Sequence, residues 1–328
     1  MTIMTKRERL TAAIQGRQVD RMPVALWRHW PVDDQQPADL AWATISFQKR
    51  YDFDFVKVTP ASSFCVRDWG ASDEWHGHYH GTRDYGPRVV SDIEDWYLLK
   101  PLDPTQGALG AQLQVLRLLR QGLGPDVPII QTIFSPLSQA KNLAGQPRML
   151  AHLRQIPEAV EAGLCTIKES TCKFVSAALE QGIDGIFYAV QHAQAHLLSA
   201  DEYRRFGCTC DLPILQRASE CWLNVLHLHG NHVFFDLLAD YPVQVINWHD
   251  RETWPTLAEG QQRFQGAVCG GIRQEETLLL GTPADVRAEA ADAIAQTGGR
   301  GLIIGTGCVT PITAPVGNLR AARQAATA

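Results

Sequence analysis

Two histidines and one cysteine stand where apolar segments of the chain end, and these residue types can hold a metal ion. Residues 224–231 read Asn-Val-Leu-His-Leu-His-Gly-Asn, which puts His227 and His229 on alternate positions of a strand-like run. Since strand side chains alternate between two faces, both imidazoles face one site. A second apolar run, residues 301–305, leads into Cys308. Two imidazoles and one thiolate suit a zinc ion that keeps a coordination position open.

The same residues also fit a structural interpretation. Histidines in a buried strand can bond to backbone groups, and a free cysteine such as Cys308 is often a small buried hydrophobe. Asp250 ends the next strand-like segment, where it can be a fourth ligand or a group that orients an imidazole. It can also be an ordinary helix N-cap, because the residues after it begin a turn or helix. On the residues alone these alternatives stay open.

Two other clusters offer metal-binding atoms. His76, His78 and His80 alternate in a segment rich in glycine and charged residues, which favours a solvated hairpin face. Cys208 and Cys210 lie in a helical pattern, where residues two apart point in different directions. The first cluster is a rival zinc site and the second is not expected to bind a metal.

Further polar residues follow the ends of other strand-like segments. Arg28, flanked by tryptophans, can clamp a carboxylate or stack on a flat ligand, and otherwise packs against the indole rings. Gln191 and His192 end another segment in the same way. We expect Arg28 to hold an anionic group of a substrate, and Trp27, Gln191 and His192 to contact a cofactor.

These residues depend on eight strand-like segments, most of them followed by a helical pattern, and that alternation predicts a parallel sheet. Eight units over this length favour a (β/α)₈ TIM barrel, with residues 1–328 as one domain. The glycine pairs do not form a dinucleotide-binding fingerprint, which disfavours a doubly wound sheet. The segments are residues 22–27, 53–58, 127–133, 185–190, 223–228, 243–247, 266–269 and 301–304.

The helical patterns complete the expected barrel. Residues 147–181 are helical with a break near Pro157, and later helices are expected at 201–219, 284–296 and 315–326. Residues 60–125 carry extra material, expected as a hairpin and a loop over the barrel mouth. Barrel enzymes place their chemistry at the C-terminal ends of the strands, where the polar residues of this chain gather. Those residues are Arg28, His29, Thr59, Ser62, Ser135, Gln191, His192, His227, His229, His249, Asp250, Arg273 and Cys308.

Composition limits the class of protein. With 45% hydrophobic and 20% charged residues and a net charge of -5, the chain is expected to be soluble and globular, without a nucleic acid partner. Its apolar runs are too short to cross a bilayer, and no signal peptide is expected. Eight scattered cysteines indicate reduced thiols and a cytoplasmic location. A homodimer is compatible with all of this.

Three segments resemble the uroporphyrinogen decarboxylase superfamily, and together they span nearly the whole chain. They are residues 7–24 (Arg-Glu-Arg, then Gly, then Asp-Arg-Met-Pro-Val), 57–60 (Lys-Val-Thr-Pro) and 305–318 (Gly-Thr-Gly-Cys, then Pro, Pro and Asn). The resemblance implies a (β/α)₈ barrel and two branches of function. One branch decarboxylates uroporphyrinogen without a cofactor. The other comprises zinc-dependent methyltransferases that move a methyl group between a corrinoid and a thiol such as coenzyme M.

The decarboxylase branch fits poorly. It has Arg-Gln-Ala-Gly-Arg after the first strand, whereas residues 28–32 read Arg-His-Trp-Pro-Val. It also has an aspartate after the second strand, and residues 59–63 contain no carboxylate. Where it has a tyrosine near the third strand end, this chain has Ser138 and Gln139. Without a carboxylate to stabilise a cationic intermediate, uroporphyrinogen decarboxylation is disfavoured.

The methyltransferase branch fits better. Its His-x-Cys-Gly-Asn motif matches residues 227–231, with His229 in place of the cysteine, and Asp250 falls at its acidic position. Cys308 lies near its Gly-Cys-Gly motif, although alignment by the glycines selects Thr306. The resemblance implies zinc on His227, His229 and Cys308, a small thiol substrate, and a corrinoid or corrinoid protein as partner. Three alternatives remain: a decarboxylase-like lyase, a zinc-free hydrolytic or lyase enzyme, and a non-catalytic corrinoid or tetrapyrrole binder.

Overall fold

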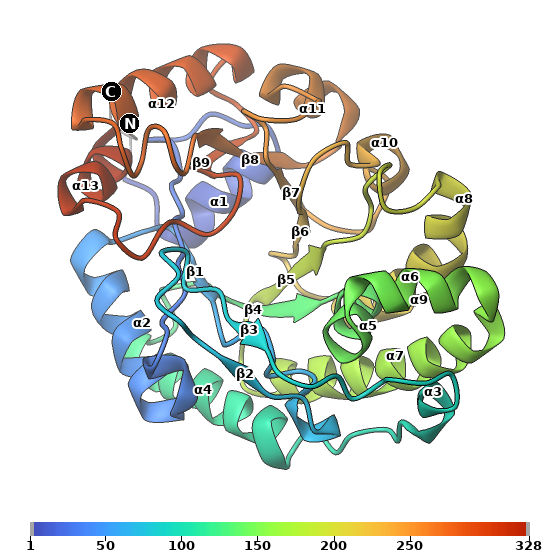
Figure 1. Cartoon of the computed structure of the whole chain (residues 1–328). Helices are drawn as coiled ribbons and strands as arrows, with labels where there is room; N and C mark the ends of the chain where they lie inside the picture. The colour runs from blue at the N-terminus through green and yellow to red at the C-terminus, as the bar shows by residue number, and fades with distance from the viewer. Residues whose placement is uncertain (1–2, 326–328) are drawn as a thin grey trace.

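Seven parallel strands form the central sheet of the computed structural model, which describes residues 3–325. Their order in space follows their order in the chain, and the sheet curls with its helices on the outside (Figure 1). Nearly every strand residue is buried, as expected for a sheet covered on both faces. The strands are β1 (Val56–Val58), β4 (Ile129–Phe134), β5 (Gly185–Val190), β6 (Val225–Leu228), β7 (Val245–Trp248), β8 (Ala267–Ile272) and β9 (Leu302–Thr306).

The first predicted strand, residues 22–27, differs from the expectation. It makes a single bridge, in which Val24 pairs with Ile304 of β9. The backbone of Ala25 donates to Ile304 at 2.9 Å, and the N–H of Asp54 donates to the carbonyl of Val24 at 2.8 Å. Pro23 has no N–H to give, so the segment cannot form a continuous ladder. The structure therefore shows a TIM-barrel-like α/β sheet of seven strands, and not a closed barrel of eight.

Helices follow the strands and cover the outside of the sheet (Figure 1). The break predicted near Pro157 is confirmed, because one helix ends at Gln155 and the next begins at Pro157, a first-turn position that tolerates proline. The longer helices are α1 (Lys6–Ile14), α2 (Pro37–Tyr51), α4 (Gly107–Leu123), α5 (Pro136–Ala144), α6 (Gln146–Gln155), α7 (Pro157–Leu179), α9 (Thr209–Arg217), α11 (Leu257–Arg263), α12 (Pro283–Thr297) and α13 (Val316–Gln324). The shorter ones are α3 (Asp95–Leu98), α8 (Ala200–Tyr203), α10 (Phe235–Leu238), the 3-10 helices η1 (Asp33–Gln35) and η2 (Arg67–Trp69), and the π-helix η3 (Arg204–Cys208).

Helix ends agree with the sequence signals where caps are present. The side chain of Thr282 accepts from the N–H of Asp285 at the start of α12, and Gly298 ends that helix in the left-handed region with φ 60°. The helix expected over 201–219 is instead divided into α8, η3 and α9. The last helix ends at Gln324, and residue 326, its expected end, lies outside the described residues.

The opening motif of the chain builds the N-terminal side of the sheet. The buried carboxylate of Asp54 accepts from Arg9 at 2.7 Å, from Arg21 at 2.8 Å and from the N–H of Val24 at 2.8 Å. Asp20 binds the other side of the Arg9 guanidinium at 2.7 Å. These charges compensate one another and fix α1 to the residues that precede β1.

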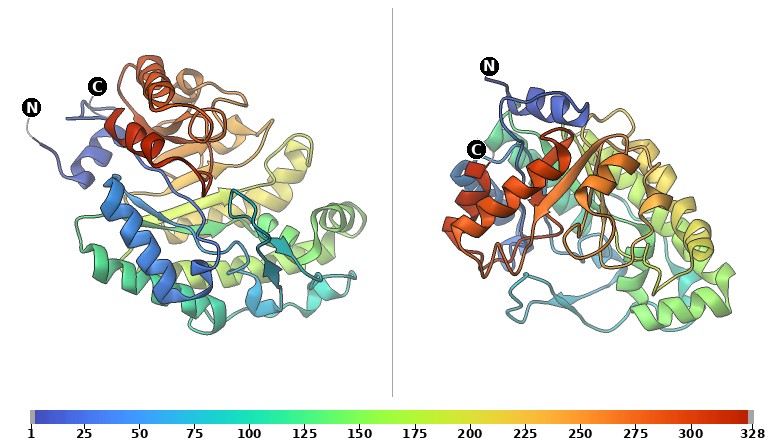
Figure 2. Two further views of the ribbon diagram at one scale, coloured as in Figure 1. Left: turned by 60° about the vertical axis from the view of Figure 1, so that its left-hand side comes forward. Right: turned by 90° about the horizontal axis from the view of Figure 1, so that it is seen from above.

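The expected hairpin is confirmed on the opposite face. Its strands β2 (Asp73–Glu74) and β3 (Asp84–Tyr85) pair antiparallel, and the loop between them crosses the C-terminal side of the sheet (Figure 1). Seen from above, α1 lies at the other end of the molecule from this hairpin (Figure 2).

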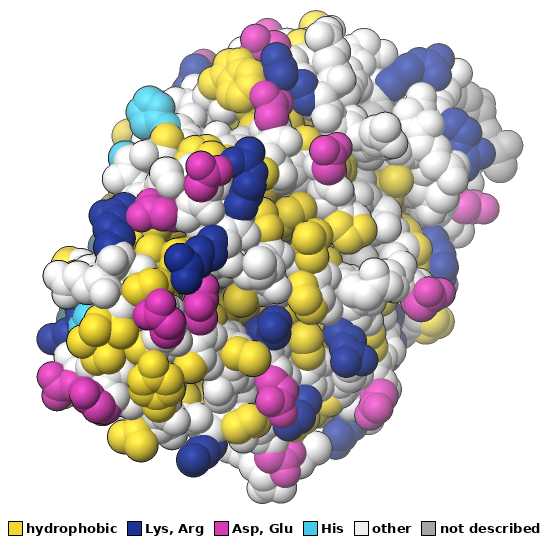
Figure 3. All heavy atoms as spheres, turned by 90° about the vertical axis from the view of Figure 1, so that its right-hand side faces the viewer, with side chains coloured by type: hydrophobic (Ala, Val, Ile, Leu, Met, Phe, Trp, Pro, Cys, Tyr) yellow, Lys and Arg dark blue, Asp and Glu magenta, His cyan; other side chains and the backbone are white. Residues whose placement is uncertain are grey.

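Basic and acidic side chains are interspersed on the face that carries α7 and α8, so this face has no patch of one charge (Figure 3). Within residues 3–325, no helix is both long and apolar enough to cross a membrane.

Candidate metal centre

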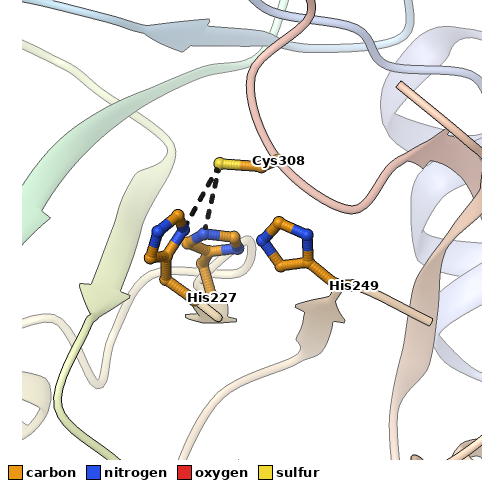
Figure 4. A group of neighbouring side chains, drawn as sticks. His227, His249 and Cys308 are labelled. Carbon is orange, nitrogen blue, oxygen red and sulfur yellow. Dashed lines mark hydrogen bonds between the residues drawn. The ribbon is translucent and has the colours of Figure 1, made fainter. Parts of the chain in front are cut away.

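Four side chains with metal-binding atoms meet at the C-terminal end of the sheet. His227 lies in β6, His229 just beyond it, His249 directly after β7, and Cys308 after β9. One ligand atom from each lies within 4.8 Å of the others. Figure 4 shows His227, His249 and Cys308 pointing toward one another, His227 from β6, His249 from the end of β7 and Cys308 from the loop after β9.

The spacing of this group fits one small ion. The sulfur of Cys308 lies 3.7 Å from Nε2 of His227 and 3.6 Å from Nδ1 of His229. A nitrogen and a sulfur bound to the same tetrahedral zinc, at their usual bond lengths, are about 3.6 Å apart. The ring of His249 completes the group, with its centroid 5.2 Å from that of His229.

Asn247 orients the first histidine. Its amide nitrogen donates to the carbonyls of Cys269 at 2.8 Å and Thr306 at 3.0 Å, so its oxygen must be the acceptor toward Nδ1 of His227, 2.7 Å away. His227 then carries its proton on Nδ1, which leaves the lone pair of Nε2 facing Cys308. This tautomer is the one required of a metal ligand.

His249 has a weaker support on its far side. Its Nδ1 lies 3.2 Å from the carboxylate of Glu252, whose side chain is 43% exposed. Its Nε2 is buried and has no hydrogen-bond partner in the described part of the chain. A buried ring nitrogen without a partner, beside a cysteine and two other imidazoles, fits a ligand position.

Asp250, predicted as a fourth ligand or as the group that orients an imidazole, lies outside this group. Both of its carboxylate oxygens are 3.2 Å from the N–H of Gly271 in β8. Burial raises its pKa to about 7, against the hydrogen bond from Gly271. Side chains alternate along β7 and its extension, so Asn247 and His249 face the interior while Asp250 faces away. That alternation was the signal in the sequence that could have selected His249.

The protonation states suit a thiolate among imidazoles. Burial lowers the pKa of His227, which keeps this imidazole neutral. Burial alone would raise the pKa of Cys308, but the neighbouring histidines outweigh it and hold that pKa well below its usual value. Burial likewise opposes the charging of His249, yet Cys308 and Glu252 outweigh it and raise its pKa to about 10. Without a metal, these groups form a thiolate–imidazolium cluster.

The group opens into a cavity of about 340 Å³. His227, His229 and Cys308 form one side, and Trp27, Phe134 and Phe187 give it apolar walls. Hairpin residues His80 to Arg83 border the same cavity. A larger hollow of about 750 Å³ lies beside α1, at the other end of the molecule, and its lining includes no histidine or cysteine.

The sequence model of one family, described as uroporphyrinogen decarboxylase (URO-D), matches residues 5–328. The chain belongs to this family. The resemblance seen in residues 7–24, 57–60 and 305–318 is thereby confirmed.

Proteins similar to this chain carry methyltransferase names. The methylcobamide:CoM methyltransferase MtbA of Methanosarcina acetivorans is 25% identical, over 98% of this chain and 97% of that protein. MtaA of Methanosarcina barkeri, with the same description, is 26% identical over 98% and 97%. A solved methyltransferase from Methanosarcina mazei shares the fold, with a TM-score of 0.87, 20% identity and 98% of both chains covered. A B12-independent methionine synthase from Shewanella sp. W3-18-1 aligns with a TM-score of 0.60 and 14% identity, over 96% and 95%.

The URO-D fold places the remaining predicted residues in different environments. Trp27 and Gln191 line the cavity, whereas His192 is buried beneath it with neither ring nitrogen bonded within the described residues. Arg28 is turned away: it donates to the carbonyl of Ile312 at 2.8 Å and stacks on Trp30, 4.4 Å from the ring centroid. It therefore takes the packing role that was its alternative, and the cations at the cavity are others.

The rival clusters do not assemble. His76 and His78 are exposed, and His80 is bonded to Glu275 at 2.8 Å. Cys208 and Cys210 belong to no group of metal-binding side chains among residues 3–325. Alignment of the last motif by its glycines selected Thr306 instead of Cys308 as the site residue. In the structure Cys308 lies beside the histidines, while the hydroxyl of Thr306 donates to the carbonyl of Cys308 at 2.6 Å.

Proposed function

We propose that this protein is a zinc-dependent methyltransferase that moves a methyl group from a corrinoid to a small thiol. The observation that carries the proposal is the group of His227, His229, His249 and Cys308 at the cavity. Three imidazoles and one thiolate are ligands that zinc takes readily. The methyltransferase names of relatives that match the chain from end to end support the reaction class.

A zinc ion held by these residues would supply Lewis acidity, which lowers the pKa of a thiol that reaches the site. Asn247 keeps His227 in the tautomer that can bind, and the apolar walls of the cavity would contact the carbon atoms of the thiol. The thiol loses its proton to solvent, and its sulfur attacks the methyl carbon as the bond from that carbon to the corrinoid breaks. The electron pair of the broken bond stays with the corrinoid.

The cavity also limits how the methyl donor arrives. A space of about 340 Å³ holds a small thiol but is too small to enclose a corrinoid ring system. The methyl group must then enter through the mouth of the cavity, which the hairpin residues His80 to Arg83 border. A corrinoid protein docked over this mouth is the proposed partner.

We place the reaction in the cytoplasm, where the eight cysteines, all free in the structure, would stay reduced.

No observation favours a decarboxylase over the proposed methyltransferase. Among the described residues, the cavity lining includes no aspartate or glutamate. A pyrrole cation would have no carboxylate partner there, and such a partner is worth several kcal/mol in comparable electrostatic sites. A corrinoid binder without catalysis would not need a thiolate in the cavity.

The test is methyl transfer by the zinc-loaded protein from methylcobalamin, or from a methylated corrinoid protein, to a small thiol. We expect thiol-dependent demethylation, followed by the change in corrinoid absorbance, and its loss in Cys308→Ala. Absence of transfer from both donors with every thiol tried would reject the methyltransferase assignment. Carbon dioxide release from uroporphyrinogen at an ordinary turnover would reject it in favour of the decarboxylase.

A further inference from the structure

Two lysines, one buried and one half-buried, border the cavity without an acidic partner. Lys57 of β1 is 8% exposed, and its ammonium lies 3.2 Å from the hydroxyl of Thr59 and 4.8 Å from the ring centroid of Phe187. Lys141 of α5 contacts the side-chain oxygen of Gln191 at 3.2 Å. Within residues 3–325, neither ammonium forms an ion pair with an aspartate or glutamate. The third cation at the cavity, Arg83, differs because it is already paired with Asp34 at 2.6 Å.

A buried ammonium is costly unless a counter-charge offsets it, and for Lys57 the charge of Cys308 offsets the cost only in part. Burial lowers the pKa of Lys57 to about 7 and that of Lys141 to about 8. An anion bound beside either lysine would remove this cost. The contacts with Thr59 and Gln191 cannot remove it, because both side chains are neutral. Cationic side chains held in this way at a cavity are typical of a ligand site.

The two lysines contact the cavity at different depths. Phe187 and Gln191 are four residues apart along β5 and its extension, which corresponds to about 13 Å on an extended chain. The metal-binding group lies between these levels, because His227 pairs with Ala189 in the sheet register. Lys57 is therefore near the floor of the cavity and Lys141 near its rim. One small anion cannot neutralise both.

We infer that the cavity binds a dianionic substrate, with one anionic group on Lys57 and the other on Lys141. The apolar side chains of Trp27, Phe134 and Phe187 would contact the carbon skeleton between them. The inference rests on the proposed function only in making this substrate the thiol acceptor, with its sulfur at the metal group between the two anions. The two anion sites themselves do not require the metal.

The test is calorimetric titration of the purified protein with unbranched dicarboxylates from malonate to adipate, each compared with the monocarboxylate of equal carbon number. We expect the best dicarboxylate to bind at least about tenfold more tightly than its partner, as one additional charge contact implies. Lys57→Met and Lys141→Met should each abolish that preference. Lys49→Met, which removes an exposed lysine of α2, should leave it unchanged.

The comparison of ligands in the unaltered protein tests the inference even if a variant folds poorly, and thermal unfolding of each variant shows whether it folds. Equal affinity for dicarboxylates and monocarboxylates would overturn it. The inference would also be overturned if only one of the two lysine variants lost the preference for dicarboxylates, because the second carboxylate would then bind the metal or another group. Binding must also survive removal of zinc by a chelator. Dicarboxylate binding without methyl transfer would reject the proposed function alone, and methyl transfer without a dicarboxylate preference would reject the dianion sites alone.

Discussion

At the scale of single residues, the capacity of this site to hold a metal depends on which groups fix each imidazole. His227 is held by Asn247, which is buried and is itself anchored to two backbone carbonyls. On the side away from Cys308, the contact that holds His249 among residues 3–325 is with Glu252, a side chain that is nearly half exposed. The first histidine is therefore a rigid ligand and the second is free to shift.

Asn247→Ala should lower zinc affinity by about 10- to 100-fold, the usual effect of losing a residue that orients a ligand. The ring of His227 would then turn, and its Nε2 would no longer be held toward Cys308. Competition against a chromogenic chelator measures the change. His78→Ala, in the exposed hairpin, is the matched control and should bind zinc normally. Unchanged affinity in the asparagine variant would show that the Nδ1 contact does not orient the ligand.

His249 and His227 should differ in their importance for metal retention. Four protein ligands would complete a tetrahedral zinc, so a thiol can bind only if one of them gives up its place or the coordination expands. We expect His249 to be that ligand. His249→Ala should retain zinc with reduced affinity, whereas His227→Ala and Cys308→Ala should lose most of it during purification. Metal content by emission spectroscopy decides this, and equal loss in all three variants would contradict the distinction.

At the scale of elements, the packing of α8 and α9 against β5 rests on one buried carboxylate. Asp211 of α9 accepts hydrogen bonds from Tyr188 of β5 at 2.5 Å, Tyr203 of α8 at 2.6 Å and Tyr241 at 2.9 Å. Burial raises the pKa of Asp211 to about 6, although the three hydroxyls favour its ionised form. The carboxyl thus binds a proton more tightly in the folded chain than in the unfolded one.

This raised pKa predicts a stability that depends on pH. Between about pH 4 and pH 6 the folded state binds more protons at Asp211 than the unfolded state does, so this contribution to the free energy of unfolding falls as the pH rises. Relative to Asp211→Asn, the unaltered protein should gain up to about 3 kcal/mol as the pH is lowered from 7 to 4. Denaturant unfolding of both proteins at several pH values measures the difference. A difference that is constant, or that grows toward high pH, would contradict the assignment.

The sequence predicted elements better than it predicted which way their side chains face. Residues 185–190 form β5 as expected, because a continuous apolar run between turn signals specifies a buried strand. The prediction of a full strand over residues 22–27 was wrong, because strand pairing depends on neighbours that are far away in the chain. His227, His229 and Cys308 were predicted and meet, since strand alternation and strand ends are local features. Other features could not be predicted from local sequence. The role of His249 depends on the register of β7, and the direction of Arg28 depends on the turn after residue 27. The position of Lys141 at the cavity depends on how α5 packs.

At the scale of the whole molecule, the two ends of the sheet have different tasks. The N-terminal side is closed by the ion pairs of Arg9, Asp20, Arg21 and Asp54, which stabilise the fold. The C-terminal side carries the metal group and the cavity, which residues His80 to Arg83 border. The hairpin that holds these residues lies on the same side of the sheet (Figure 1). This division follows the general pattern of barrel enzymes. If the proposed function holds, the mouth is the surface where a methyl donor would dock.

The central claim, that zinc in this group activates a thiol, is tested most directly by X-ray absorption at the zinc edge, with and without a small thiol. The geometry predicts a first shell of three nitrogens and one sulfur in the protein as purified, at about 2.0–2.1 Å and 2.3 Å. Addition of the thiol should bring a second sulfur into that shell. A protein that binds no zinc, or a shell that gains no sulfur from any thiol, would contradict the account.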